Sequence, residues 1–290
     1  MSVNVHIPDN MPALYGAAET ASARGQQGFR QLTAAALILL IVAAVGGMID
    51  EHWAGWMSAA AFAIGTAATT LWVYRRHENE WYDGRAAAES AKSLTFKYAV
   101  GGQPYGVDDA AAKDEYAGAL AAIVAELKQL GSPVEASAGP GDLGDLDRLR
   151  AAELADRQAV YRSQRIEEQR GWYASRAREH RRNGRRWQGT MIALNVAGII
   201  GASLKGLGVI DFDVLGLFAT MAASVAAWVA AVDYLRIARA YEVAAVELGE
   251  VLERSNETST EAEWSSFVAD AEHAMSREHT LWQARRRGKT

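Results

Sequence analysis

Cysteine is absent from this chain of 290 residues, and proline is scarce, with five residues. The absence of cysteine excludes disulfide bonds, thiol catalysis, anchoring through a lipid-modified cysteine and cysteine-ligated metals, and it indicates no particular compartment. Strand signals are missing as well, because no stretch alternates apolar and polar residues between turn residues. The sequence therefore predicts an all-α protein.

Motifs of catalysis are also missing. The run GASLKGLG at 201–208 lacks the Gly-Lys-Ser/Thr end of a phosphate-binding loop, and no dinucleotide fingerprint occurs. The histidines lack the spacing of metal ligands. Glu272, Glu278 and His279 are interpreted as part of a solvated helix face. The sequence thus predicts no enzyme, no cofactor and no metal site.

Charge is missing from four long runs. Residues 32–49, 53–74, 188–204 and 214–232 contain no Asp, Glu, Lys or Arg. Each run is close to the ~20 residues that cross the hydrocarbon core of a bilayer. A soluble bundle with buried helices is the alternative, but four such runs in one chain favour a membrane. Short turns join them in pairs, which predicts an all-α membrane protein with four transmembrane helices arranged as two hairpins.

Lysine and arginine near the four runs lie almost entirely on one side of them. The turn between the first two runs has none, and the turn between the last two has only Lys205. The opposite ends carry Arg24, Arg30, Arg75, Arg76, Arg181, Arg182, Arg185, Arg186, Arg236 and Arg239. Because basic residues stay in the cytoplasm, this asymmetry predicts a multi-pass protein of the inner membrane with external turns and both termini cytoplasmic.

A Gly- and Pro-rich segment at 131–145 is the linker-like stretch of the chain. It predicts four parts. These are an N-terminal tail with a lead-in helix (1–30), the first hairpin with its cytoplasmic helices (31–130), the linker (131–145), and the second hairpin with flanking helices (146–290).

The cytoplasmic helices are predicted to pack as coiled-coil-like bundles. Apolar residues recur at alternating spacings of four and three within 116–130 and 234–252. A long charged helix is expected to run from residue 146 to the third span. The two apolar seams would suit self-assembly or the recruitment of a partner.

Weakly polar side chains inside the predicted spans are candidates for lining a pore or for packing helices together. They are Ser58, Thr66, Thr69, Thr70, Asn195, Thr220 and Ser224. Packing, in which small side chains let helices approach, is the favoured interpretation for any single residue. In an oligomer both roles are compatible.

Charged residues flank the spans on both sides. The external turns carry Asp50, Glu51, Asp211 and Asp213, and a ring of such carboxylates would favour cations. Alternatively, these acids only mark the turns as solvated.

The cytoplasmic side carries a belt formed by Arg75, Arg76, Arg181, Arg182, Arg185 and Arg186. Nucleic acid is a possible ligand for such a cluster, but a position one turn before a span favours anionic lipid headgroups. Membrane lipid is therefore the expected partner, and nucleic acid is not.

Three segments of the second half carry aromatic and charged residues at distinctive places in helices: YRSQRIEEQRGWYASRAREHRRNGRRW at 161–187, DYLRIARAYEVAAVELGE at 233–250, and FVADAEHAMSREHTLWQARR at 267–286. They resemble the bacterial SLATT domains, two-transmembrane effector domains associated with nucleotide-second-messenger systems. The first half, with ENEWYDGRAAAESAKSLTFKYAVGGQPY at 78–105, is similar to a second, divergent SLATT type. The resemblance implies a tandem of two SLATT units.

Two classes of function are left open. The resemblance implies a homo-oligomeric membrane pore or channel-like effector in a prokaryotic conflict or antiphage system, with cytoplasmic helices for assembly and sensing. It also implies a nucleotide-signalling partner protein. The alternative is a non-conducting membrane scaffold that recruits a cytoplasmic partner through its coiled-coil helices.

Overall fold

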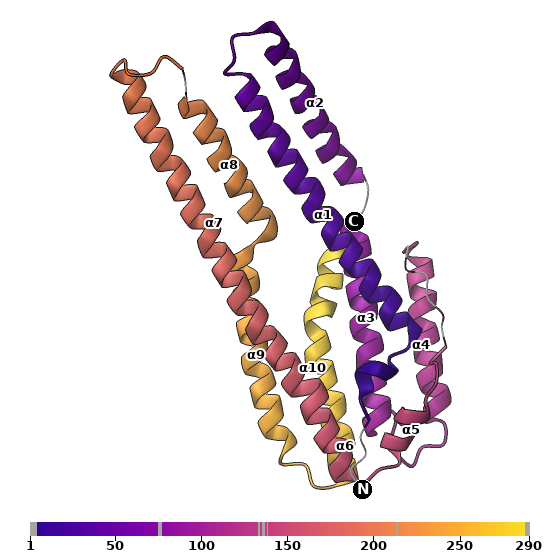
Figure 1. The fold of residues 1–290 in the computed structure, drawn as a ribbon. Coiled ribbons are helices and arrows are strands. Elements are labelled where there is room, and N and C mark those ends of the chain that lie inside the picture. Colours follow the sequence, from indigo (N-terminus) through magenta and orange to yellow (C-terminus); the bar gives the residue numbers. More distant parts are fainter. Residues whose placement is uncertain are drawn as a thin grey trace. The chain divides into compact units, whose positions relative to one another are not determined.

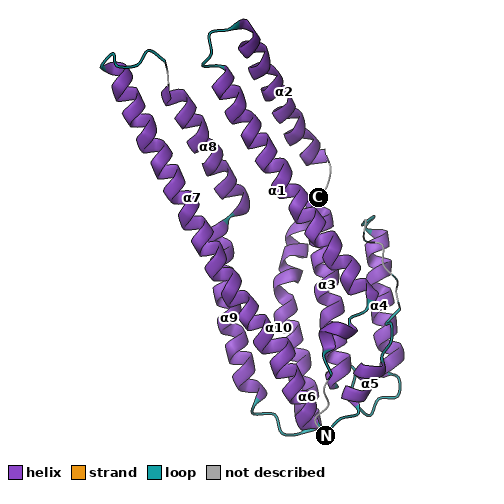
Figure 2. Ribbon diagram, viewed as in Figure 1, coloured by secondary structure: helices purple, strands orange, loops and turns teal. Residues whose placement is uncertain are grey.

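The computed structural model describes residues 5–74, 77–132, 134, 137, 139–212 and 214–287. These residues form helices joined by loops, and no strand occurs among them (Figure 2). The all-α prediction is confirmed. The α-helices are α1 (Ala13–Gly46), α2 (His52–Tyr74), α3 (His77–Val100), α4 (Ala112–Gln129), α5 (Gly144–Arg150), α6 (Leu154–Tyr161), α7 (Glu168–Gly206), α8 (Val214–Val232), α9 (Tyr234–Ser255) and α10 (Glu261–Arg287).

Among the described residues, three helices are long and apolar enough to cross a membrane. They are Ala13–Gly46, Leu154–Gly206 and Val214–Ser255. The predicted span 53–74 falls in α2, which contains no Asp, Glu, Lys or Arg but is not one of these three. Four spans therefore stay a prediction.

The chain divides into two compact units. Unit 1 comprises residues 1–25, 78–173 and 243–290, and unit 2 comprises residues 26–77 and 174–242. Each unit takes segments from both sides of 131–145. The division of the sequence into four parts stays a prediction, and the two compact units have different boundaries from those parts.

Unit 2 contains both predicted hairpins. Figure 1 shows α1 beside α2 and α7 beside α8. In each pair the helices touch at glycine: Gly46 lies against Ser58, and Gly201 against the side chain of Val214. A methyl group at either glycine would overlap its neighbour, so glycine is what lets each pair approach closely.

Unit 1 has an aromatic core. The rings of Tyr98 and Tyr116 stack at 4.8 Å between centroids, with Tyr105 edge-on to both. The Trp264 indole N–H donates to the carbonyl of Val100, at 2.9 Å. Large rings at the end of α3 thus join α4 and α10 around one apolar centre.

Both predicted seams are used inside the chain. Tyr116, Leu120 and Leu127 of α4 are buried, as are Tyr234, Ala238 and Leu248 of α9. Coiled-coil packing stays a prediction, and these faces are already covered in a single chain.

The long helix predicted from residue 146 is wrong in one respect. Helix α5 ends at Arg150, and α6 begins only at Leu154 after Glu153, whose backbone is extended at φ −62° and ψ 152°. From Leu154 the chain does run helically to Gly206, but the stretch Arg162–Glu167 is a π-helix.

Candidate functional site

Most of the weakly polar residues of the predicted spans hydrogen-bond to their own helix. The side chains of Ser58, Thr66, Thr70, Asn195 and Thr220 each donate to the carbonyl oxygen four residues earlier, at 2.8–3.0 Å. A hydroxyl that donates in this way needs no water or partner helix for its proton, so it is compatible with lipid.

The remaining members of this set have different surroundings. Ser224 is buried. The Thr69 side chain lies outside the described residues. Ser58, Thr66 and Thr70 lie on α2, Asn195 lies on α7, and Thr220 and Ser224 lie on α8.

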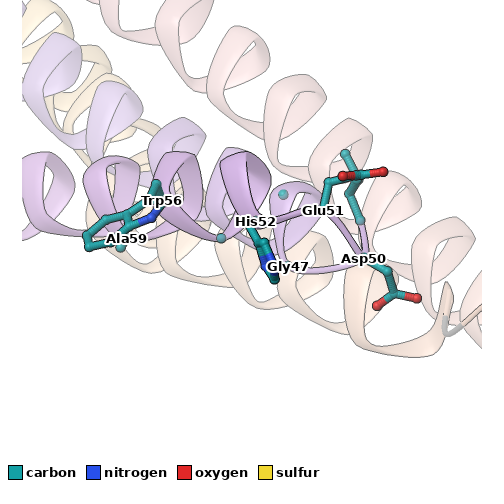
Figure 3. Close-up of a pocket in the computed structure, with 9 residues that line it drawn as sticks. Gly47, Asp50, Glu51, His52, Trp56 and Ala59 are labelled. Carbon is teal, nitrogen blue, oxygen red and sulfur yellow. The ribbon is translucent and has the colours of Figure 1, made fainter.

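The acids of the first turn surround a shallow hollow of about 680 Å³. Figure 3 shows that the carboxylates of Asp50 and Glu51 point in different directions, while His52 and Trp56 follow on the first turns of α2. The Trp56 side chain is 79% exposed. Asp211 in the second turn is exposed as well, and Asp213 lies outside the described residues.

The arginines of the predicted cytoplasmic belt differ in their contacts. Arg181 forms an ion pair with Glu242 of α9, with Nη2 donating to Oε2 at 2.6 Å. Arg182, Arg185 and Arg186 are exposed, with no ion pair among the described residues. Arg75 and Arg76 lie outside the described residues.

The base of the second hairpin holds an aromatic cluster around His180. Its ring lies 5.8 Å from that of Tyr234 and 5.7 Å from that of Tyr241, centroid to centroid. The Nδ1 atom is buried without a hydrogen-bond partner among the described residues. Burial, followed by the charge of Arg30, lowers the pKa of His180, so its neutral form is the one that fits this site.

Unit 1 contains a cluster of buried charges centred on Arg165, whose side chain is fully buried in the π-helical stretch. It donates twice to Glu272, from Nε at 2.8 Å and from Nη2 at 2.6 Å. Nη2 also donates to Glu89 at 3.1 Å and Nη1 to Gln169 at 2.6 Å. The guanidinium lies 5.3 Å from the centre of the Phe96 ring.

Electrostatics hold Arg165 in its charged form. Burial alone would lower the pKa of Arg165, but Glu272 and Glu89 outweigh it, and the pKa lies well above its ordinary value. Burial, followed by the charge of Glu272, raises the pKa of Tyr161, whose hydroxyl donates to Glu272 at 2.9 Å. Arg165 faces two carboxylates, and a second cation, Lys92, lies nearby, where its amine is hydrogen-bonded to Gln169 at 3.5 Å. Two acidic and two basic side chains leave the cluster close to electrical balance.

Sequence reasoning missed this cluster. The interpretation of Glu272 as part of a solvated face is wrong, because its side chain is fully buried. The side chains of Glu278 and His279 lie outside the described residues. Arg165 and Glu272 are 107 residues apart, so no local pattern links them. In the sequence Arg165 lies between Gln164 and Ile166, in a run that was predicted only as part of a long charged helix, so nothing marked this arginine as buried.

Two further arginines fix the end of α3. Arg150 donates from Nη1 to the carbonyls of Tyr98 and Tyr105, at 2.9 and 2.7 Å. Arg157 donates to the carbonyl of Val100 at 3.0 Å and pairs with Glu261. Cations at the carboxyl end of a helix satisfy its last carbonyls and its dipole.

Two protein-family models match the chain, one after the other. The model described as SMODS and SLOG-associating 2TM effector domain 3 matches residues 12–158, half of the chain, and effector domain 1 of the same series matches residues 161–282. The chain belongs to the SLATT family. It is a tandem of two SLATT domains, as the sequence predicted. No curated protein and no solved structure gives a significant match.

The apolar helices and the two-transmembrane description make this SLATT protein membrane-associated. The cluster around Arg165 joins the two domains. Glu89 lies in the first SLATT domain, whereas Arg165 and Glu272 lie in the second. Unit 1 is therefore a composite of both domains.

Proposed function

We propose that this SLATT protein is a homo-oligomeric membrane pore with four transmembrane helices per chain, α1, α2, α7 and α8. The four helices cross the inner membrane. Unit 1 and both termini lie in the cytoplasm, and the turns at 47–51 and 207–213 lie on the outer side of the membrane. The arginine asymmetry along the sequence supports this topology.

The observation that carries the proposal is how each hairpin distributes its side chains. The helices of each hairpin touch at glycine, so neither hairpin encloses a path for water. Thr66, Thr70 and Asn195 remain exposed, among apolar residues such as Ile199, which is 65% exposed. Weakly polar side chains on the outside of a hairpin can line water only where several copies bring them together.

The acids of the external turns support a modest preference for cations. Asp50, Glu51 and Asp211 are exposed, and repetition around an oligomer would gather carboxylates at the entrance. Replacing them and Asp213 by Asn or Gln should move the reversal potential in a salt gradient toward zero, most strongly at low ionic strength.

Ion flux from liposomes tests the proposal. Purified protein reconstituted in liposomes should release a trapped ion, and the solubilised protein should be larger than a dimer by mass photometry. Flux should rise more steeply than linearly with protein density, because assembly precedes conduction. A strict monomer without flux contradicts the pore.

A non-conducting scaffold is the second candidate, and α9 favours it. Val243 and Val246 of unit 1 are 57% and 64% exposed on this helix, an apolar surface beside glutamates that a cytoplasmic partner could cover. Absence of flux from a stable oligomer would favour this candidate. The nucleotide-signalling partner implied by the family stays a proposal under either function.

A further inference from the structure

The π-helical stretch Arg162–Glu167 interrupts the helix that leads from unit 1 into the third predicted span. Its hydrogen bonding is wider than that of an α-helix, because the Glu168 N–H donates to the carbonyl of Ser163, five residues earlier. The Ser163 hydroxyl lies 2.9 Å from the carbonyl oxygen of Ala159 and 3.2 Å from that of Val160. It can therefore satisfy a carbonyl that the wider turn leaves without its usual partner.

Three side chains of this stretch each hold a different part of unit 1. Arg162 donates to Ser255 at the end of α9, to Oγ at 3.0 Å and to the carbonyl at 2.6 Å. Gln164 binds the N-terminal segment. Its Nε2 donates to the Val5 carbonyl at 2.7 Å, and its Oε1 accepts from the Ile7 N–H at 2.8 Å. Arg165 binds α3 and α10.

The helix continues from this stretch without a break. Helix α7 runs from Glu168 to Gly206 and includes the predicted span 188–204. In an α-helix each residue contributes about 100° of rotation and about 1.5 Å of rise. Taking up the extra residue of the π-helical stretch would therefore turn the rest of α7 by about 100° relative to α6.

Intermediate positions are unfavourable because Arg165 and its carboxylates are buried, and a buried charge that loses its partner is strongly destabilising. The helix is thus expected to have discrete registers rather than a continuous range, which is what a switching element requires. The contacts of Arg162 and Gln164 tie the present register to α9 and to the N-terminal segment.

We propose that Arg162–Glu167 is a register switch through which unit 1 sets the rotation of α7, and with it the face that the third span presents. The present, π-helical register of this stretch is held by Arg162, Gln164 and Arg165. Release of these contacts converts the stretch to α-helix and turns α7. The inference deepens the proposed function, because it names how a signal received by unit 1 would reach a pore.

The chain has no cysteine, so single introduced cysteines can report the register directly. Ala177→Cys lies after the switch at a position that is 2% exposed, and Val160→Cys lies before it at a position that is 9% exposed. Each is labelled with a maleimide in the full chain, in the otherwise unchanged protein, with Arg162→Ala and Gln164→Ala together, and with Ser163 deleted. The double substitution keeps the residue count and releases two of the contacts that hold the π-helical register. The deletion removes the extra residue, so the stretch can become α-helical without turning α7, and it is the matched control.

The variant with Arg162→Ala and Gln164→Ala should raise the labelling rate of the Ala177→Cys variant by about tenfold or more, since a protected site becomes accessible. Labelling of the Val160→Cys variant, and of either variant with Ser163 deleted, should stay within about twofold. Continued protection of the thiol at position 177 after release of the two contacts overturns the switch, whatever happens at position 160.

If the double variant does not fold, Arg162→Ala alone replaces it, and unchanged labelling at position 177 again overturns the proposal. Labelling needs no conduction, so the switch and the pore are tested separately. A change in labelling without liposome flux supports the switch and contradicts the pore.

Discussion

Unit 1 and unit 2 satisfy their polar groups in opposite ways. In unit 1 the bonds join segments far apart in sequence, such as Arg165 with Glu272 and Trp264 with Val100. In unit 2 the hydroxyls of Thr70 and Thr220 return to their own helix, four residues back, and helices meet at glycines. Lipid supplies no hydrogen bonds, so polar side chains of a membrane helix are best satisfied by bonds within their own helix. In water, polar side chains can exchange hydrogen bonds with water for bonds to other segments of the protein.

The division between the units also differs from the division between the domains. Each SLATT domain contributes one apolar hairpin to unit 2, and both contribute helices to unit 1. The tandem is therefore more than two copies of an effector side by side, because its polar unit is shared.

The largest effect is expected from removing the centre of unit 1. Arg165→Ala leaves Glu272 and Glu89 buried without their cation, and breaking such a pair destabilises by about 3–5 kcal/mol. Thermal and denaturant unfolding of the purified protein measure the loss. Arg176→Ala, which removes a pair with Glu179 that is about half exposed, is the control and should cost at most about 1 kcal/mol. Equal losses of stability in the two variants would mean that the buried cluster contributes no more than an exposed ion pair.

The next effect tests close packing in unit 2. Gly201→Leu places a side chain where Val214 already lies, and overpacking of this kind typically costs about 1–3 kcal/mol. The matched control is Gly189→Leu on the same helix, because a Cβ added there meets nothing within 4 Å. Melting temperature in detergent is the readout. A similar loss in both variants would contradict glycine-mediated contact between α7 and α8.

A smaller, pH-dependent effect is expected from His180. Its pKa is lower in the folded protein, so between that value and its ordinary value of about 6.5 the unfolded state binds more protons. Stability therefore falls as the pH falls through this window. His180→Phe should remove that part of the acid sensitivity while leaving the melting temperature at pH 8 nearly unchanged. An identical pH profile in both proteins would exclude His180 as the cause.

The smallest effects are expected where polar groups are satisfied locally. Thr70→Val and Thr220→Val should each change stability by about 0.5 kcal/mol or less. Thr95→Val in unit 1 is the contrast: it removes the partner of the buried Tyr116 hydroxyl, 2.9 Å away, and should cost about 1–3 kcal/mol. Reversal of this order would remove the distinction between the units. A change in liposome flux with Thr70→Val at unchanged stability would identify that residue as pore-lining.

The sequence was sufficient for the parts of the fold that depend on local composition. Uncharged runs predicted the helix Val214–Val232 at its observed bounds, and the lead-in helix and first span follow one another in α1. The cluster at Arg165 was not predictable in this way, because its partners Glu89 and Glu272 are brought together only by the packing of α3 and α10 against the π-helical stretch Arg162–Glu167. The π-helical stretch leaves no pattern of its own in sequence.

The central claim is that the two SLATT domains share one folding unit, and a split chain tests it most directly. Residues 1–140 and 141–290 are expressed separately and together, and unfolding of each sample is followed by tryptophan fluorescence, since Trp264 is buried against the first domain through Val100. We predict that the two pieces co-purify and unfold in one transition, and that 141–290 alone unfolds at a markedly lower temperature. A piece 141–290 that is as stable alone as in the intact chain would contradict the account.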